Sequence, residues 1–262
     1  HEWEEPFISG EKGSGTVFFS GCNLRCIFCQ NREIALSNRG TPLTIKELAE
    51  VMLGLQKEGA HNINLVTAGH FAPAVVRTLL LAKEKGLTIP IVYNTSGYET
   101  VETIQCLRGL VDIYMPDFKY ISSELSLRYS GASDYAERTA DAIAFMYDTL
   151  GRAVFDDDAM MRRGLLVRHL VLPACRKDSE AVLRRLADII PPKDIVLGLM
   201  SQYTPSFYGG EEKALRRRVT SFEYEYVRKV ALELGFEGYM QSPMSATAEF
   251  TPKFTNALTI EL

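Results

Sequence analysis

Short apolar runs alternate along this chain with longer segments whose apolar residues recur at the spacing of an amphipathic helix. Several of the short runs are apolar throughout, which is typical of strands covered on both faces of a parallel sheet. Repeated strand–helix units of this kind predict an α/β fold. We predict strands over residues 16–20, 62–67, 90–94, 112–115, 165–172 and 194–200, and helices over residues 45–57, 73–85, 101–107, 133–150, 179–189 and 221–234.

These strand–helix units are too few for a full eightfold barrel. Because right-handed crossovers curl a parallel sheet, we predict a partial (β/α)6 barrel of the TIM-like type. Thr44 and Glu47 form a capping box at the start of one helix, and Gly86 and Gly235 end two others. Residues 151–164 interrupt the rhythm with three consecutive aspartates between apolar flanks, which predicts a hairpin insertion with an acidic turn.

The length of 262 residues fits one large α/β barrel or two small domains, and we predict a single barrel domain over residues 1–262. Residues 1–15 precede the first predicted strand, and we expect this lead-in segment to pack over the mouth of the barrel. The chain starts with His1 rather than Met, so we expect part of the native N-terminus to be missing.

Charge and hydropathy exclude several classes of partner. The formal net charge of −4 argues against a broad nucleic-acid surface, and no apolar run approaches the ~20 residues that span a bilayer. No signal peptide is visible, and the five cysteines, three of them within eight residues, do not resemble a secreted disulfide framework. We therefore expect a cytoplasmic protein that binds neither nucleic acid nor membranes.

The most informative segment carries Cys22, Cys26 and Cys29 directly after the first predicted strand. Active sites in parallel α/β folds lie at the carboxyl ends of the strands, where this loop belongs. A [4Fe–4S] cluster normally takes four cysteines, so three thiolates leave one iron open to a further ligand. One alternative is a zinc site, whose fourth ligand would come from His70, His169 or Cys175. Another is a simple electron-transfer cluster.

The C-x3-C-x2-C spacing, with Phe28 just before the last cysteine, resembles the motif of radical S-adenosylmethionine (SAM) enzymes. The resemblance implies a [4Fe–4S] cluster on Cys22, Cys26 and Cys29 whose open iron chelates SAM. In that family an electron cleaves SAM to a 5′-deoxyadenosyl radical, which abstracts hydrogen from the substrate. It also implies oxygen-sensitive, anaerobic chemistry and a low-potential electron donor, a flavodoxin or a ferredoxin.

The ends of the other strands resemble those of glycyl-radical-enzyme activases such as pyruvate formate-lyase activating enzyme. The similar stretches are residues 94–97 (Asn-Thr-Ser-Gly), 117–119 (Asp-Phe-Lys) and 168–173, an arginine-bearing strand that ends in proline. Activases carry Gly-Gly-Glu after the second strand. This chain instead has Thr67-Ala68-Gly69-His70 there, without a carboxylate, so we expect His70 to accept the SAM amino group or to read the substrate.

Elementary geometry supports part of this assignment. Asp117 and Lys119 are two residues apart, so on an extended chain both point to one face. Arg168 interrupts an apolar strand and needs an anionic partner, for which the SAM carboxylate is a natural choice. His169 faces the other way. The resemblance implies SAM contacts from Phe28, Gly69, His70, Asn94, Ser96, Asp117, Lys119, Arg168, Gln202 and Tyr203.

The sequence therefore predicts an enzyme of the radical SAM type that abstracts hydrogen from a protein or peptide, with a glycine of a partner enzyme as a candidate. One alternative keeps the radical chemistry and acts on a small molecule. Another is a non-catalytic iron–sulfur or zinc binding module.

Overall fold

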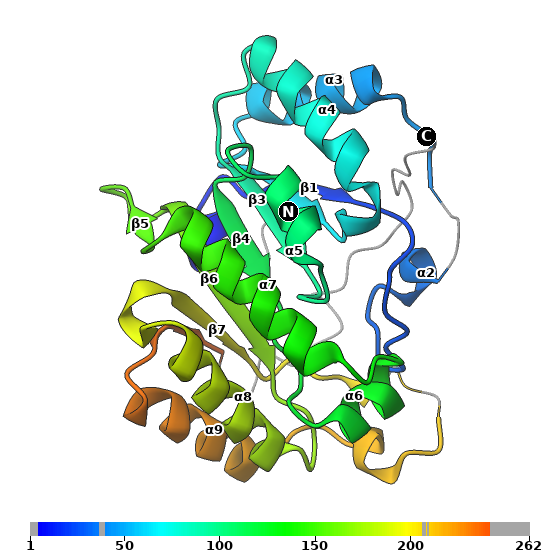
Figure 1. Ribbon diagram of the computed structural model, residues 1–262, viewed down its shortest axis with the longest axis vertical. Helices are drawn as coiled ribbons and strands as arrows, with labels where there is room; N and C mark the ends of the chain where they lie inside the picture. The colour runs from blue at the N-terminus through cyan, green and yellow to red at the C-terminus, as the bar shows by residue number, and fades with distance from the viewer. Residues whose placement is uncertain (1–4, 37–39, 206–207, 209, 242–262) are drawn as a thin grey trace.

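The computed structural model describes residues 5–36, 40–205, 208 and 210–241, and these residues form a curled, mostly parallel sheet with helices on its outer face (Figure 1). The strand order is β1-β2-β3-β4-β6-β7-β8, and every neighbouring pair in this order is parallel. The strands are β1 (Gly15–Phe18), β2 (Ile63–Val66), β3 (Ile91–Thr95), β4 (Ile113–Pro116), β5 (Val154–Phe155), β6 (Met161–Leu170), β7 (Val196–Met200) and β8 (Glu237–Met240). The predicted partial α/β barrel is confirmed.

The described part of the sheet has one more parallel strand than the sequence predicts. The prediction contained six, whereas β8 adds a seventh beside β7. Its sequence, Glu-Gly-Tyr-Met, lacks a run of β-branched residues and is half exposed, so the pattern gave no strand signal. The predicted hairpin insertion is confirmed, because β5 pairs antiparallel with β6. Asp156 forms the acidic turn and accepts hydrogen bonds from the amides of Asp158 and Met160.

Helices follow the strands along the outer face of the sheet. Figure 1 shows α3 and α4 at one end, α5 and α7 in the middle and α8 and α9 at the other end. The helices are α1 (Pro6–Ser9), α2 (Arg32–Ala35), α3 (Ile45–Lys57), α4 (Ala72–Glu84), α5 (Val101–Cys106), α6 (Ser123–Ser130), α7 (Tyr135–Leu150), α8 (Arg176–Ile189) and α9 (Ser221–Glu233), with 3-10 turns η1 (Gly69–Phe71), η2 (Pro192–Asp194) and η4 (Lys213–Arg216). The predicted capping box of Thr44 and Glu47 opens α3.

Alternation along each strand divides the sheet into two faces. On β3, Ile91 and Tyr93 pack in the large core under the helices, whereas Val92 belongs to a second apolar cluster inside the barrel. Asn94 also lies on the inner side and lines a cavity. The inner face is therefore apolar near the amino ends of the strands and polar near their carboxyl ends, which places a ligand site at the carboxyl ends.

The lead-in segment closes the opposite end of the barrel, so the prediction that it packs over the mouth was wrong. Ile8 of α1 is fully buried in the inner cluster with Val92 and Ile113, close to the amino ends of their strands. The Asn62 side-chain amide donates to the Ile8 carbonyl oxygen at 2.8 Å and fixes this position. Residues 1–4 of the segment lie outside the described residues.

In the part of the chain that the structure describes, none of the helices combines the length and apolar character needed to cross a membrane.

Candidate functional site

The cysteine loop follows β1 and is held in place by the end of α6. The Arg25 amide donates to the Ser130 carbonyl oxygen at 3.0 Å, and the Ile27 amide donates to the Tyr129 carbonyl oxygen at 2.9 Å. Leu24 anchors the same loop in the main core with 2% exposure. These contacts fix the loop backbone, and thereby the positions from which the three thiols extend.

The three thiols line one cavity and each has a hydrogen-bond donor close by. The Leu24 amide donates to Cys22 Sγ at 3.4 Å, the Asn31 amide bonds Cys29, and the Ser130 hydroxyl lies 3.1 Å from Cys26 Sγ. Burial and the neighbouring thiol of Cys26 raise the pKa of Cys29 to about 12. Because iron binds thiolates, loading a cluster here would release protons.

These observations fit an iron–sulfur cluster better than an inert cysteine loop. Soft thiolates are the ligands of such clusters, and hydrogen bonds to the sulfurs are the usual second layer of support. No group of three or more His, Cys, Asp or Glu side chains among the described residues is arranged to hold a single metal ion. The fourth zinc ligands considered above, His70, His169 and Cys175, do not line the cavity within the described part of the chain.

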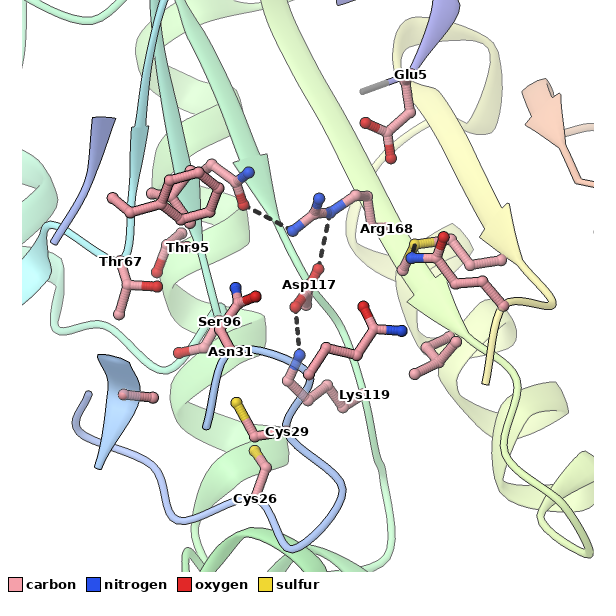
Figure 2. A pocket seen from close by; sticks show the side chains of 18 of the residues that line it. Glu5, Cys26, Cys29, Asn31, Thr67, Thr95, Ser96, Asp117, Lys119 and Arg168 are labelled. Atoms are coloured by element: carbon pink, nitrogen blue, oxygen red, sulfur yellow. Dashed lines mark hydrogen bonds and ion pairs between the residues drawn. The ribbon is translucent and has the colours of Figure 1, made fainter. Parts of the chain in front are cut away.

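A charged network faces the thiols from the ends of β4 and β6 (Figure 2). Asp117 forms an ion pair with Lys119 and accepts a hydrogen bond from Arg168 Nε at 2.9 Å. Arg168 Nη2 donates to the side-chain oxygen of Asn94 at 2.6 Å. These side chains are largely buried; those of Asp117, Lys119 and Arg168 are each only 15–16% exposed. Arg168 thus has an anionic partner just after β4 and an amide partner on β3.

Opposite charges keep this network ionised. Burial by itself raises the pKa of Asp117, but the charges of Arg168 and Lys119 outweigh burial and hold that pKa below its ordinary value of 3.8. Burial likewise lowers the pKa of Lys119, and the Asp117 carboxylate more than reverses the effect. The cavity therefore presents fixed charges of both signs, which suits a zwitterionic ligand.

Tyr135 of α7 ties the ends of β3 and β4 together. Its hydroxyl lies 2.8 Å from the Ser96 carbonyl oxygen and 2.9 Å from the Asp117 carbonyl oxygen, and it accepts from the Lys119 amide at 3.1 Å. A side chain on Gly97, which has φ +80°, would overlap the Asp117 carbonyl oxygen, so only glycine lets the two strand ends approach. Tyr135 was not predicted from the sequence, where it lies in the first turn of a predicted helix.

We expect Tyr135→Phe to lower the free energy of unfolding by about 1–3 kcal/mol, because it removes the hydroxyl that satisfies buried backbone groups. Chemical denaturation monitored by circular dichroism measures the change. Tyr98→Phe is the matched control: the Tyr98 ring stacks on Tyr135, but its hydroxyl bonds the exposed Asp134. An equal decrease in the free energy of unfolding in both variants would show that the hydrogen bonds of Tyr135 to the strand ends do not stabilise the fold.

The cavity that these groups enclose has a volume of about 640 Å³, within the range of small-molecule sites. It runs from the cysteine loop to α1 inside the barrel. The predicted residues that line it are Cys22, Cys26, Phe28, Cys29, Asn94, Ser96, Asp117, Lys119, Arg168 and Gln202. The predicted thiols, the charged network and the polar residues at the ends of β3 and β7 therefore lie together in one cavity.

Three predicted cofactor contacts, Gly69, His70 and Tyr203, are not among the described residues that line the cavity. The Tyr203 hydroxyl donates to the Leu215 carbonyl oxygen at 2.6 Å, and its ring packs edge-on against Phe28. His70 Nε2 lies 2.7 Å from the Ser20 carbonyl oxygen, so it braces the start of the cysteine loop. His169 is buried behind the sheet, where burial lowers its pKa to about 4.

Gly69 has a different role, because a buried carboxylate lies against it. A Cβ on Gly69 would fall 2.5 Å from Glu99 Oε1, and that oxygen accepts the Thr95 hydroxyl at 2.5 Å. Burial raises the pKa of Glu99 above its usual range. A carboxylate from the loop after β3 thus lies beside Gly69, but Glu99 is not among the described residues that line the cavity. No local pattern around Glu99 indicates this placement.

Other cavity residues also escaped prediction. Figure 2 shows Glu5 at the α1 end of the cavity near Arg168, and Asn31 beside the thiols. Thr67 lines the cavity with φ 62°, a left-handed conformation that is strained for a β-branched residue. Gln241 follows β8 and donates to the Gln202 side-chain oxygen at 3.2 Å. Glu5 and Gln241 come from the two segments whose place in the barrel the sequence does not reveal.

The geometry defines a partial α/β barrel with a trio of thiols at the mouth of a charged cavity. The family model of the radical SAM superfamily matches residues 16–151, more than half of the chain. The chain therefore belongs to the radical SAM superfamily, whose members are enzymes that use a [4Fe–4S] cluster and SAM. The predicted superfamily and cofactor class are confirmed.

Two curated relatives are similar in sequence. Uncharacterized protein MJ0674 of Methanocaldococcus jannaschii is 30% identical over 233 residues, which is 84% of this chain and 61% of that protein. This chain thus spans less than two thirds of the length of that relative. The pyruvate formate-lyase-activating enzyme of Clostridium pasteurianum is 26% identical over 179 residues, covering 66% of this chain and 68% of the enzyme.

Two solved structures share the fold. SuiB of Streptococcus suis, bound to the precursor peptide SuiA, superimposes with a TM-score of 0.57 at 13% identity and covers 89% of this chain and 50% of SuiB. The FeFe-hydrogenase maturase HydG of Carboxydothermus hydrogenoformans gives 0.55 at 10% identity, with 94% and 58% covered. At these identities the similarity supports the fold alone.

Proposed function

We propose that Cys22, Cys26 and Cys29 bind three irons of a [4Fe–4S] cluster, and that the fourth iron is left for SAM in the adjoining cavity. The observation that carries the proposal is that the three thiols and the network of Asp117, Lys119 and Arg168 line the same cavity. A site for a cluster alone would not need a charged cavity beside it.

In this proposal the charged residues hold the methionine end of SAM. The Lys119 ammonium and the Asp117 carboxylate offer one partner each to the carboxylate and the amino group of the ligand. Asn94, Ser96 and Gln202 supply polar contacts, and Phe28 supplies an apolar one. Bound there, cluster and SAM together supply a 5′-deoxyadenosyl radical that abstracts hydrogen. A low-potential flavodoxin or ferredoxin provides the electron.

We propose a peptide or protein as the substrate, with a glycine as the position of hydrogen abstraction. Support comes from the pyruvate formate-lyase-activating enzyme among the sequence relatives. β1 and β8 stand at opposite ends of the strand order and do not pair in the described residues. An extended segment could enter between them.

Anaerobic incubation of the reconstituted protein with dithionite and SAM tests the proposed function. We expect 5′-deoxyadenosine and methionine in equal amounts, measured by liquid chromatography. Protein without iron is the control. A protein that holds its full iron content and still forms no 5′-deoxyadenosine would contradict the proposal.

Glycine-deuterated peptides separate the substrate classes. Hydrogen abstraction from a peptide glycine would place deuterium in the 5′-deoxyadenosine, which mass spectrometry detects. Deuterium transfer from a small molecule, with none from a library of such peptides, would favour the alternative substrate class.

A further inference from the structure

Cys26 differs from the other two cysteines in the kind of donor that faces its sulfur. The donors to Cys22 and Cys29 are the backbone amides of Leu24 and Asn31. The donor to Cys26 is the side-chain hydroxyl of Ser130, 3.1 Å from Sγ and 104 residues away in sequence. This contact can therefore be removed by substitution without any change to the backbone.

A second hydroxyl extends the contact into a chain. Tyr120 Oη lies 3.0 Å from Ser130 Oγ, and both residues are only 1% exposed. A thiolate bound to iron carries no proton and can only accept a hydrogen bond. The direction of the chain is then fixed: Tyr120 donates to Ser130, and Ser130 donates to the Cys26 sulfur. Such chains polarise one another in surroundings of low dielectric.

We propose that Ser130, supported by Tyr120, tunes the reduction potential of the cluster through this hydrogen bond to Cys26. The inference rests on the proposed function, because it requires the cluster on these cysteines. Adding an electron makes the cluster and its sulfurs more negative, so a hydrogen bond to sulfur is stronger in the reduced form. The Ser130 hydroxyl therefore raises the potential and makes the cluster easier to reduce.

The loop itself does not depend on the Ser130 side chain. Its position rests on the backbone bonds from Arg25 to the Ser130 carbonyl oxygen and from Ile27 to the Tyr129 carbonyl oxygen, together with the buried Leu24. An alanine at position 130 keeps these contacts. Ser130 thus acts through Cys26, by stabilising negative charge on its sulfur, and does not itself touch the substrate.

A potentiometric titration of the reconstituted holoprotein, monitored by electron paramagnetic resonance, tests the proposal. For Ser130→Ala we expect the ratio of reduced to oxidised cluster at a fixed potential to fall about tenfold, which is a shift of about 59 mV for one electron. For Tyr120→Phe we expect a smaller fall in the same direction, because Ser130 keeps its own proton.

Ser126→Ala is the matched control. Ser126 lies one turn earlier on α6 and is equally buried, but its hydroxyl donates to the Ser123 carbonyl oxygen. Its ratio is expected to match that of the wild type. A Ser130→Ala protein with full iron content and an unchanged or higher potential would overturn the inference. A wild-type protein that binds no cluster would instead refute the proposed function, so the two failures are distinguishable.

Discussion

Alanine in place of Cys22, Cys26 or Cys29 is expected to abolish SAM cleavage. Each substitution removes one of the three proposed iron ligands from a loop whose backbone stays docked on α6. Changes in the second layer around a metal cost about 10–100-fold in metal affinity or activity, so the loss of a direct ligand should exceed about 100-fold. Iron and sulfide content, visible absorbance and 5′-deoxyadenosine formation measure the effect.

The remaining cysteines provide controls on the same chain. Cys175 is half-buried like the three loop cysteines, and Cys106 is exposed. Cys175→Ala and Cys106→Ala should keep the cluster and the activity. Loss of iron from Cys175→Ala, or a complete cluster in Cys26→Ala, would show that the ligands are assigned wrongly.

Asp117→Asn is expected to have the second largest effect. It leaves Arg168 and Lys119 as neighbouring buried cations without their shared carboxylate. Removal of one partner of a buried ion pair costs about 3–5 kcal/mol in the free energy of unfolding. We also expect SAM binding to fall below detection in calorimetry of the reconstituted variant, since the cavity gains a full positive charge.

Asp134→Asn is the matched control for Asp117→Asn, and the effect of Asp117 on stability also depends on pH. Asp134→Asn breaks an exposed ion pair with Arg138 and should cost at most about 1 kcal/mol. The pKa of Asp117 is lower in the folded protein than its ordinary value of 3.8. The contribution of Asp117 to the free energy of unfolding is therefore complete above pH 3.8 and is lost as the pH falls through the pKa of the folded state. Equal destabilisation by the two substitutions in urea unfolding would contradict the role of the buried network.

Local patterns predicted the parts of the site that depend on short spacings. The cysteine loop follows a strand directly, and Asp117 and Lys119 share a face because they are two residues apart on an extended chain. The hairpin at β5 was visible because three aspartates interrupt apolar residues. Each of these features is encoded within a few residues, so one sequence is enough to find it.

Contacts between distant segments could not be predicted in this way. Arg168 was expected to need an anion from SAM, but the pairing of β4 with β6 brings Asp117 to it across 51 residues. Glu99 reaches Gly69 from the loop after β3, and Ser130 reaches the cysteine loop from α6. The register of the sheet and the packing of the helices determine these partners. The residues next to each one in the sequence carry no pattern that indicates its distant partner.

In the proposed function, three sulfur ligands leave one iron available to SAM. Electron paramagnetic resonance of the dithionite-reduced protein, recorded with and without SAM under anaerobic conditions, tests it most directly. We predict a [4Fe–4S]⁺ signal whose g-values change when SAM is added, because the ligand set of one iron changes. A cluster signal that is identical in the presence of saturating SAM would show that SAM does not bind the open iron.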